Sequence, residues 1–588
     1  MNKSFTQKCV ATILLASSFT GLAAGKKGIA TYIDKNSTAL GADAQKRVKE
    51  MEGQKFNAPH FRIPDAEYRE DWQKLRNRPV PEWLQDAKFG IYTHWGLFSI
   101  PGNPDASNTY VRYMYTDDVS DKKKKKAYKS GVHGFHKERY GDPTEFGYSD
   151  FTKLFKCEKF DAKEYVEIMK DAGAKFGGLG VVHHDGFLMW DSEVVPWNVG
   201  KMGPKRDIFG EFVEAAKEED FKTFASFHHA RSFEYASSYL NENDFSEEEK
   251  SKLDLFDPKF DTWFFPSWGS AGPEKFNELW LKKVREVIDK YQPDSLWFDG
   301  LSPQEHCTEA SHLDFMNHYY DQAEKNNQDV VLFNKLPGSG FFNFPQGVGV
   351  KCYEGGRDMA PNVPGPFLID KAISYPWSYV ENKTYKFGPD YHVDGLVDMT
   401  ARGGYYLMSL TPMASGEIPP QEKKICSEIG KWLRVNGEAI YSTRPWKVST
   451  EGPLNTFMYK PDKGVVYWDY RAPTKEGEIR FTQKGDYMYA IFLDWSDEKF
   501  SIRSLSKSMI PNAKIESVEL LGHNEALEYR QESDALQIKS PTQKPHEYAY
   551  AFKIKLSGDV GNKMIANTPV TMPENTMSYD AIAEKHSK

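Results

Sequence analysis

The chain reads GGLGVVHHDG over residues 177–186, DIFGEFVEAAKEED over 207–220 and KTFASFHHA over 222–230. The first and last of these runs are short and largely apolar, as expected of strands buried on both faces. The middle run repeats its apolar residues at helical spacing. A buried strand, an amphipathic helix and a second buried strand form the repeating unit of α/β folds, so this stretch predicts a parallel sheet covered by helices.

The same alternation extends in both directions. Short apolar runs also occur at residues 89–96, 294–300, 330–335, 347–354, 373–379 and 403–410, and amphipathic helices are expected at 161–175, 273–292 and 427–437. Eight strand-like runs, mostly separated by helices, predict a (β/α)₈ barrel over residues 80–446. The run at 373–379 is the assigned seventh strand.

Beyond Trp446 the pattern changes to short β-type runs with turn residues between them. This pattern predicts a β-sandwich over residues 447–560, followed by a loosely ordered tail over 561–588. Residues 25–79 are expected to form a polar amino-terminal extension.

Composition and the amino terminus limit the function. The formal net charge of −8 argues against a general nucleic-acid-binding protein, and the aromatic content of 14% suits stacking on sugar rings as well as ordinary core packing. Residues 1–24 have the basic start, apolar run and small residues of a secretory signal. We therefore expect an exported protein, periplasmic or secreted, with no membrane span. The four remaining cysteines are widely spaced and predict neither a zinc site nor a disulfide framework.

Reactive and ring-bearing side chains terminate six consecutive strand-like runs. A barrel places its active site at the carboxyl ends of its strands, so these side chains are expected to share one mouth. In chain order they are His94 with Trp95, His183 with His184, His228 with His229, Trp297 with Asp299, Lys335, and Glu354.

The spacing of these residues separates several chemistries. A metal hydrolase typically has histidines two residues apart on one strand, whereas the pairs here are adjacent and diverge on a regular strand. A metal remains an alternative if the chain bends at Asp185–Gly186, and no GxSxG motif marks a serine nucleophile. Two carboxylates on different strands, Asp299 and Glu354, fit the outline of a glycoside hydrolase.

The chain also resembles the α-L-fucosidases of glycoside hydrolase family 29. The resemblance covers residues 80 to 500 approximately and follows the family's order of motifs. It is carried by WLQDAKFGIYTHWGLFSIPG (83–102), HHDGFLMWDS (183–192), WNVGKMGPKRDIFGEFVEA (197–215), PDSLWFDG (293–300), GGYYLMSLTPMASGEIPP (403–420), EIGKWLRVNGEAIYSTRPW (428–446) and IRFTQKGDYMYAIFLDW (479–495).

The resemblance implies a retaining hydrolase without a cofactor, acting on an oligo- or polysaccharide that carries α-L-fucose. Asp299 would be the nucleophile, and Glu354 is the candidate acid/base, with Glu381 and Glu305 in reserve. The residues expected to contact the sugar are His94, Trp95, Tyr110, His183, His184, His228, Trp297 and Lys335.

Several positions depart from the family pattern. Val182 stands where relatives carry lysine, and Lys335 stands where arginine is common. The stretches Asn108-Thr109-Tyr110, Phe227-His228-His229 and Gly404-Tyr405-Tyr406 also differ. We therefore expect an exo-acting, retaining α-L-fucosidase whose substrate differs from plain fucosides.

Sulfated fucan oligosaccharides are the substrate hypothesis, because of the third-strand histidines, Lys335 and the lysine run 122–126. The alternatives are a sugar-binding protein on a fucosidase scaffold with weak catalysis and, third, a metal-dependent hydrolase.

Overall fold

The structure is a computed structural model that describes residues 60–61, 69–300, 306–336, 341–345, 347–356, 365–460, 465–472, 474–561 and 570–571. The expected signal sequence, the tail beyond residue 561 except for 570–571, and the reserve carboxylate Glu305 lie outside these residues. None of the helices in the described ranges has the length and apolar character needed to cross a membrane.

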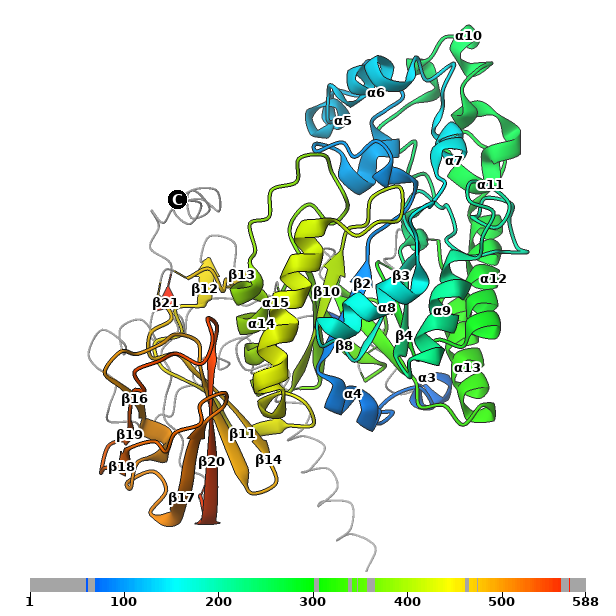
Figure 1. Cartoon of the computed structure of the whole chain (residues 1–588). Helices are drawn as coiled ribbons and strands as arrows, with labels where there is room; N and C mark the ends of the chain where they lie inside the picture. Colours follow the sequence, from blue (N-terminus) through cyan, green and yellow to red (C-terminus); the bar gives the residue numbers. More distant parts are fainter. Residues whose placement is uncertain are drawn as a thin grey trace, which may run out of the picture.

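Eight parallel strands close into a barrel, in the order β10-β2-β3-β4-β5-β6-β8-β9 (Figure 1). The strands are β2 (Phe89–Thr93), β3 (Phe176–Val182), β4 (Lys222–Phe227), β5 (Ser295–Phe298), β6 (Val331–Leu336), β8 (Val350–Glu354), β9 (Phe367–Ala372) and β10 (Gly404–Leu410). The predicted barrel is therefore confirmed, and seven of its strands fall on the expected runs.

The seventh strand was placed wrongly. It is β9, which pairs with β8 through Glu354 and Asp370 and with β10 along its whole length. The expected run 373–379 follows β9 as a loop and contains Pro376, which has no N–H to donate to a central ladder. The true strand, FLIDKA, was overlooked because Asp370 and Lys371 interrupt its apolar pattern.

Helices cover the outside of the barrel (Figure 1). They are α8 (Ala162–Asp171), α9 (Ile208–Glu218), α12 (Pro273–Tyr291), α13 (Glu309–Lys325), α14 (Pro389–Ala401) and α15 (Pro420–Asn436). Asp161 and Asp207 cap the first two by accepting from backbone N–H groups of the first turn, and Pro273 occupies the first position of α12. The four expected helices are present, and α13 and α14 are additional.

An apolar cluster fills the inside of the barrel, with members from all eight strands, among them Tyr92, Phe224, Trp297 and Leu368. Leu84 and Ala87 of α4 (Glu82–Ala87) belong to the same cluster. The interior is therefore a packed core rather than a channel, and the polar strand ends lie above it.

Two insertions extend the carboxyl end of the barrel. One follows β2 and carries η3 (Ser107–Arg112), α5 (Lys122–Ala127) and α6 (Val132–Tyr140), and the other follows β4 and carries α10 (Glu247–Lys250) and α11 (Asp261–Phe264). They lie together at the top of Figure 1 and contact each other where the Ser120 amide donates to Asp244. These insertions therefore surround the barrel mouth.

The carboxyl-terminal part is a β-sandwich, as predicted. A five-stranded sheet, β11 (Arg444–Glu451), β14 (Ile479–Lys484), β15 (Tyr487–Phe492), β20 (Tyr550–Asp559) and β17 (Asn512–Leu520), shares one apolar core with the three-stranded sheet of β16 (Lys499–Ile502), β19 (Leu536–Lys539) and β18 (Tyr529–Gln531). A third small sheet contains β13 (Val465–Trp468), β12 (Phe457–Lys460) and β21 (Val570–Thr571).

A buried ionic network joins the sandwich to the barrel. Arg480 of β14 donates to Asp398 of α14 and, at 2.9 Å, to Glu478, and all three side chains are fully buried. Arg402 also donates to Asp398, at 3.1 Å. Because buried charges are tolerated only when they are paired, this network fixes α14 against the sandwich.

Candidate active site

The carboxyl ends of neighbouring strands bring most of the predicted residues together. His94 follows β2, His183 and His184 follow β3, and His228 follows β4. Asp299 follows β5, Lys335 is the penultimate residue of β6, and Glu354 ends β8. These strands are adjacent in the barrel, so the side chains meet at one mouth.

Asp299 lies at the centre of this group, with its side chain only 10% exposed. Its Oδ1 atom accepts from the Lys335 ammonium at 2.5 Å, and its Oδ2 atom lies 3.4 Å from both His184 Nε2 and His228 Nδ1. Arg231 Nη1 lies 3.9 Å from the same oxygen. Burial alone would raise the pKa of Asp299, but Lys335 and Arg231 outweigh it and hold that pKa well below the ordinary value. Asp299 is therefore an ionised, desolvated carboxylate, which is the state a nucleophile needs.

Lys335 connects Asp299 to Glu354. Its ammonium lies 3.0 Å from Glu354 Oε2 as well as 2.5 Å from Asp299 Oδ1, so these two oxygens are no more than about 5.5 Å apart, the sum of the two distances. Burial would lower the pKa of Lys335, but Asp299 and Glu354 raise it above its ordinary value. The sequence had suggested that Lys335 contacts the sugar. Its ammonium is not free for that contact. It is the counter-ion of both carboxylates.

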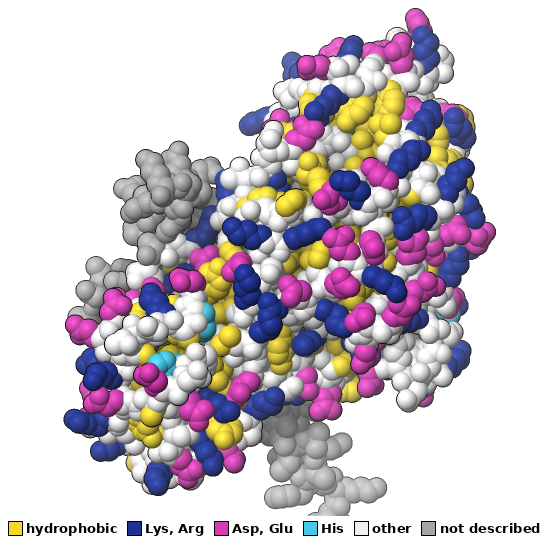
Figure 2. All heavy atoms as spheres, in the orientation of Figure 1, with side chains coloured by type: hydrophobic (Ala, Val, Ile, Leu, Met, Phe, Trp, Pro, Cys, Tyr) yellow, Lys and Arg dark blue, Asp and Glu magenta, His cyan; other side chains and the backbone are white. Residues whose placement is uncertain are grey.

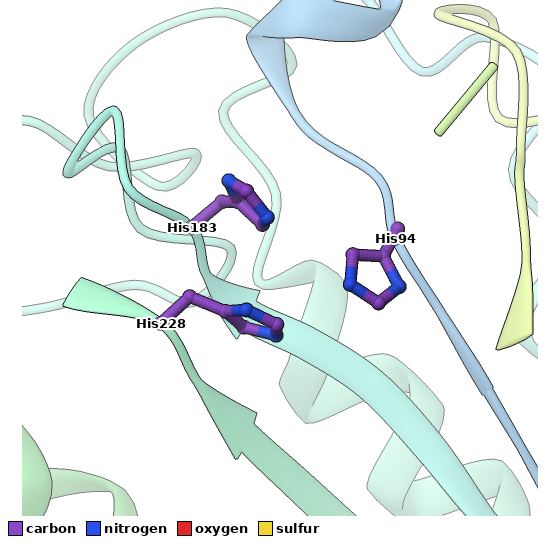
Figure 3. Close-up of side chains that lie close together, drawn as sticks. All are labelled: His94, His183 and His228. Carbon is purple, nitrogen blue, oxygen red and sulfur yellow. The ribbon is translucent and has the colours of Figure 1, made fainter. Parts of the chain in front are cut away.

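Three histidine rings face one another across the mouth (Figure 3). The ring centroids of His94 and His228 are 5.0 Å apart, those of His94 and His183 are 5.6 Å apart, and His183 stacks on His228 at 4.6 Å. Burial lowers the pKa of each of them, and it lowers the pKa of His184 to about 3. The cluster is therefore neutral over the physiological pH range.

The hydrogen-bond partners fix the tautomers of the His183–His184 pair. The Asn108 amide donates to His183 Nε2 at 3.2 Å, which leaves the proton on Nδ1. His184 donates from Nδ1 to the carbonyl of His228 at 2.8 Å, so its Nε2 is an acceptor. The pair thus presents one N–H donor and one nitrogen acceptor, a combination suited to sugar hydroxyl groups.

A metal fits this site poorly. Two groups in the described residues, His94–His183–His228 and His184–His228–Asp299, have candidate ligand atoms within 4.8 Å of one another. In the first group His183 and His228 are stacked with ring planes 27° apart, so their lone pairs, which lie in the ring planes, are confined to two nearly parallel planes and are poorly placed to converge on one ion. In the second group Lys335 and Arg231 already supply positive charge to Asp299, and a dication beside them is electrostatically unfavourable.

Three predicted aromatic contacts, Trp297, Trp95 and Tyr110, are buried and do not line an open part of the mouth. Trp297 is 1% exposed inside the barrel, where its indole N–H donates to Cys352 Sγ at 3.3 Å and its ring lies 4.5 Å from the Lys335 ammonium. It therefore supports Lys335 from below instead of lining an open pocket. Trp95 points to the opposite side of the chain from His94 and packs on Phe155 and Phe160.

Tyr110 is fully buried, and its hydroxyl group is hydrogen-bonded to His136 at 3.0 Å. His229 diverges from His228 and packs near Trp280. The reserve carboxylate Glu381 is in an exposed ion pair with Arg139. The structure does not bring any of these three to the Asp299 cluster.

Four residues at the mouth were missed by the sequence interpretation. They are Asn108, Arg231, Asp370 and Trp377. Arg231 comes three residues after His228 and Trp377 lies in the loop taken for a strand, with its ring 5.1 Å from His94. Asp370 is hidden in β9, where burial raises its pKa to about 7 and Cys352 Sγ lies 3.4 Å from its Oδ1 atom. Arg231 could have been found from the sequence because it lies close after a strand end. Asp370 carried no such signal.

A (β/α)₈ barrel with two carboxylates and neutral hydroxyl-binding groups at its carboxyl end defines a glycoside hydrolase. The family models for "Alpha-L-fucosidase" and "Alpha-L-fucosidase C-terminal domain" match residues 58–438 and 472–555. The chain belongs to the α-L-fucosidase family.

Individual relatives agree with this assignment. The chain is similar to the tissue alpha-L-fucosidase of Rattus norvegicus, with 26% identity over 75% of this chain and 81% of the relative. It is 27% identical to a putative alpha-L-fucosidase of Caenorhabditis elegans, over 82% and 91% of the two chains. The alpha-fucosidase of Thermotoga maritima, solved in complex with fucose, has a similar structure, with a TM-score of 0.59, 25% identity and coverage of 82% of this chain and 99% of the other. The protein is an α-L-fucosidase-type glycoside hydrolase.

Proposed function

We propose that the protein is an exo-acting, retaining α-L-fucosidase that removes terminal α-L-fucosyl residues by double displacement. The observation that carries this proposal is the separation of at most about 5.5 Å between an Asp299 oxygen and a Glu354 oxygen. Retaining enzymes place their two carboxyl groups about 5–5.5 Å apart, whereas inverting enzymes need about 6.5–9.5 Å to admit a water molecule.

In the first step Asp299 Oδ attacks the anomeric carbon as the glycosidic C–O bond breaks, and Glu354 gives its proton to the departing oxygen. His183 and His184 hold sugar hydroxyl groups through one donor and one acceptor. In the second step Glu354 removes a proton from water, the resulting hydroxide equivalent attacks the anomeric carbon, and the ester bond to Asp299 breaks.

Lys335 couples the two steps electrostatically. In the resting site its ammonium is shared by two carboxyl groups, and a proton on Glu354 removes the repulsion between them. When Asp299 becomes an ester it loses its charge. Of the two carboxyl groups, only Glu354 then remains as an anionic partner of Lys335. This stabilises the ionised Glu354 that must act as the base.

Hydrolysis of 4-nitrophenyl α-L-fucoside tests the activity, and NMR of the first-formed fucose tests the stereochemistry. The proposal expects the α anomer first, and no activity in Asp299→Ala. If the β anomer appeared first, the enzyme would be inverting. Equal traces of activity in wild type and Asp299→Ala would favour the sugar-binding alternative.

The substrate hypothesis changes in the light of these contacts. Lys335 is paired and His228 is neutral, so neither offers charge to a sulfated fucan. The lysines of α5 remain on the insertion that follows β2, all of them exposed except half-buried Lys124. Positive and negative side chains are interspersed over the face shown in Figure 2, so any preference for an anionic glycan must come from local groups. We also propose export on the signal-like residues 1–24, which amino-terminal sequencing of secreted protein would test.

A further inference from the structure

Arg112 ends η3, and its guanidinium lies close to two tyrosine rings. Its guanidinium carbon lies 4.6 Å from the ring centroid of Tyr235 and 4.5 Å from that of Tyr239. Its Nε atom donates to Ser238 Oγ at 2.8 Å. Two ring contacts and one hydrogen bond fix the plane of the guanidinium before any ligand arrives.

No carboxylate among the described residues forms an ion pair with Arg112. Other arginines of the chain, such as Arg206 and Arg434, do pair with carboxylates, at 2.5 and 3.0 Å. Lys129 is a cationic neighbour, with its ammonium 5.5 Å from the ring of Tyr113, a ring from which Arg112 lies 5.9 Å away. Arg112 therefore adds positive charge to this part of the mouth without an anionic partner of its own.

This guanidinium lies beside the catalytic cluster. The Tyr235 ring on which it stacks is 4.9 Å from the ring of His184, and His184 Nε2 is 3.4 Å from Asp299. Burial raises the pKa of Tyr235 to about 12 even though Arg112 and Arg231 both lower it, so this ring lies within the field of both cations. Asn108, on the same short helix, reaches His183. One side of the sugar site is thus built by η3.

We propose that Arg112 is a specificity-determining residue that binds an oxyanion, a sulfate ester or a carboxylate, on the glycan bound next to His184. The inference rests on the proposed hydrolase function and assigns to Arg112 the anion preference that Lys335 does not supply. The guanidinium is held by Ser238 through Nε and by a side-chain hydrogen bond to Tyr235, and its remaining N–H groups are donors for an oxyanion. Such bonds lie within reach of a substituent on the fucosyl ring or on its neighbour.

The test compares kcat/KM for a sulfated fuco-oligosaccharide with kcat/KM for its desulfated form. In Arg112→Gln the ratio of the two is expected to fall at least about tenfold, and Arg112→Lys is expected to recover part of it because charge returns without the fork. Arg434→Gln, an exposed arginine on α15 paired with Asp171, is the matched control and should leave the ratio unchanged. Added NaCl should lower the wild-type ratio.

A ratio that is the same in wild type and Arg112→Gln would overturn the proposal. This includes the case in which kcat/KM falls equally for the sulfated and desulfated oligosaccharides because Tyr235 has moved. A parallel measurement with a uronic-acid-bearing fucoside separates carboxylate from sulfate recognition. If neither oligosaccharide is hydrolysed, the proposed hydrolase function is wrong. Calorimetric measurement of oligosaccharide binding then tests the role of Arg112 separately. Weaker binding of the sulfated oligosaccharide to Arg112→Gln would then support it, and equal binding would contradict it.

Discussion

Replacing Lys335 by methionine removes the positive charge that Asp299 and Glu354 share. Both carboxyl groups lose their counter-ion, and their oxygens remain within about 5.5 Å of each other. Asp299 then ionises less readily. The nucleophile must be ionised, so the acidic limb of the pH profile of kcat/KM should move to higher pH.

The size of the displacement follows from the distance. An opposite charge within about 4–6 Å lowers the pKa of a carboxyl group by about 1–3 units, and the Lys335 ammonium that the variant loses lies 2.5 Å from Asp299. Arg231, 3.9 Å from Asp299, remains in place and limits the displacement. We expect the acidic limb to move upward by about one to two pH units.

The assay is the pH dependence of kcat/KM with 4-nitrophenyl α-L-fucoside for wild type, Lys335→Met and Lys335→Arg. Below the acidic limb, Lys335→Met should be about 10- to 100-fold slower than wild type, and Lys335→Arg should keep this limb close to its original position because it keeps the charge. A Lys335→Met profile that is lower at every pH but not displaced would refute the reasoning, because Lys335 would then act through packing alone.

Three further outcomes are expected. Glu354→Ala should hydrolyse poor leaving groups far more slowly than aryl fucosides, and azide should restore turnover by giving a fucosyl azide of the substrate's own anomeric configuration; no azide product would remove Glu354 from the acid/base role. Arg480→Met should lower the free energy of unfolding in urea by about 3–5 kcal/mol, because it takes the Arg480 charge away from buried Asp398 and Glu478, of which Asp398 alone keeps a second arginine, Arg402; a loss below about 1 kcal/mol would contradict the network. Full activity should persist in EDTA, and a loss that zinc restores would reinstate the metal-dependent alternative.

The sequence predicted the barrel because most of its strands are uninterrupted apolar runs. It failed at β9, where Asp370 and Lys371 are buried within the strand. Their burial depends on partners from other elements: Cys352 beside Asp370, and Tyr391, whose hydroxyl group lies 3.0 Å from the Lys371 ammonium. No periodicity in a single segment reports contacts of that kind.

The sequence predicted which residues meet at the candidate site better than it predicted what each of them does there. Alternation along a regular strand was expected to separate His183 from His184, but β3 ends at Val182 and the pair lies on irregular backbone, with ring centroids 4.3 Å apart. The same alternation, applied to His94 and Trp95, would have removed Trp95 from the site. The role of Lys335 required the distance between two other strand ends, which only the folded barrel defines.

The central claim is that Asp299 forms a covalent bond to the anomeric carbon. Incubation with a 2-deoxy-2-fluoro-fucosyl fluoride, followed by proteolysis and mass spectrometry, tests it most directly. The account predicts one added fluorofucosyl group, located on Asp299 by fragmentation of its peptide, in wild type and not in Asp299→Ala. An adduct on another carboxylate, or steady turnover of the probe with no adduct, would contradict it.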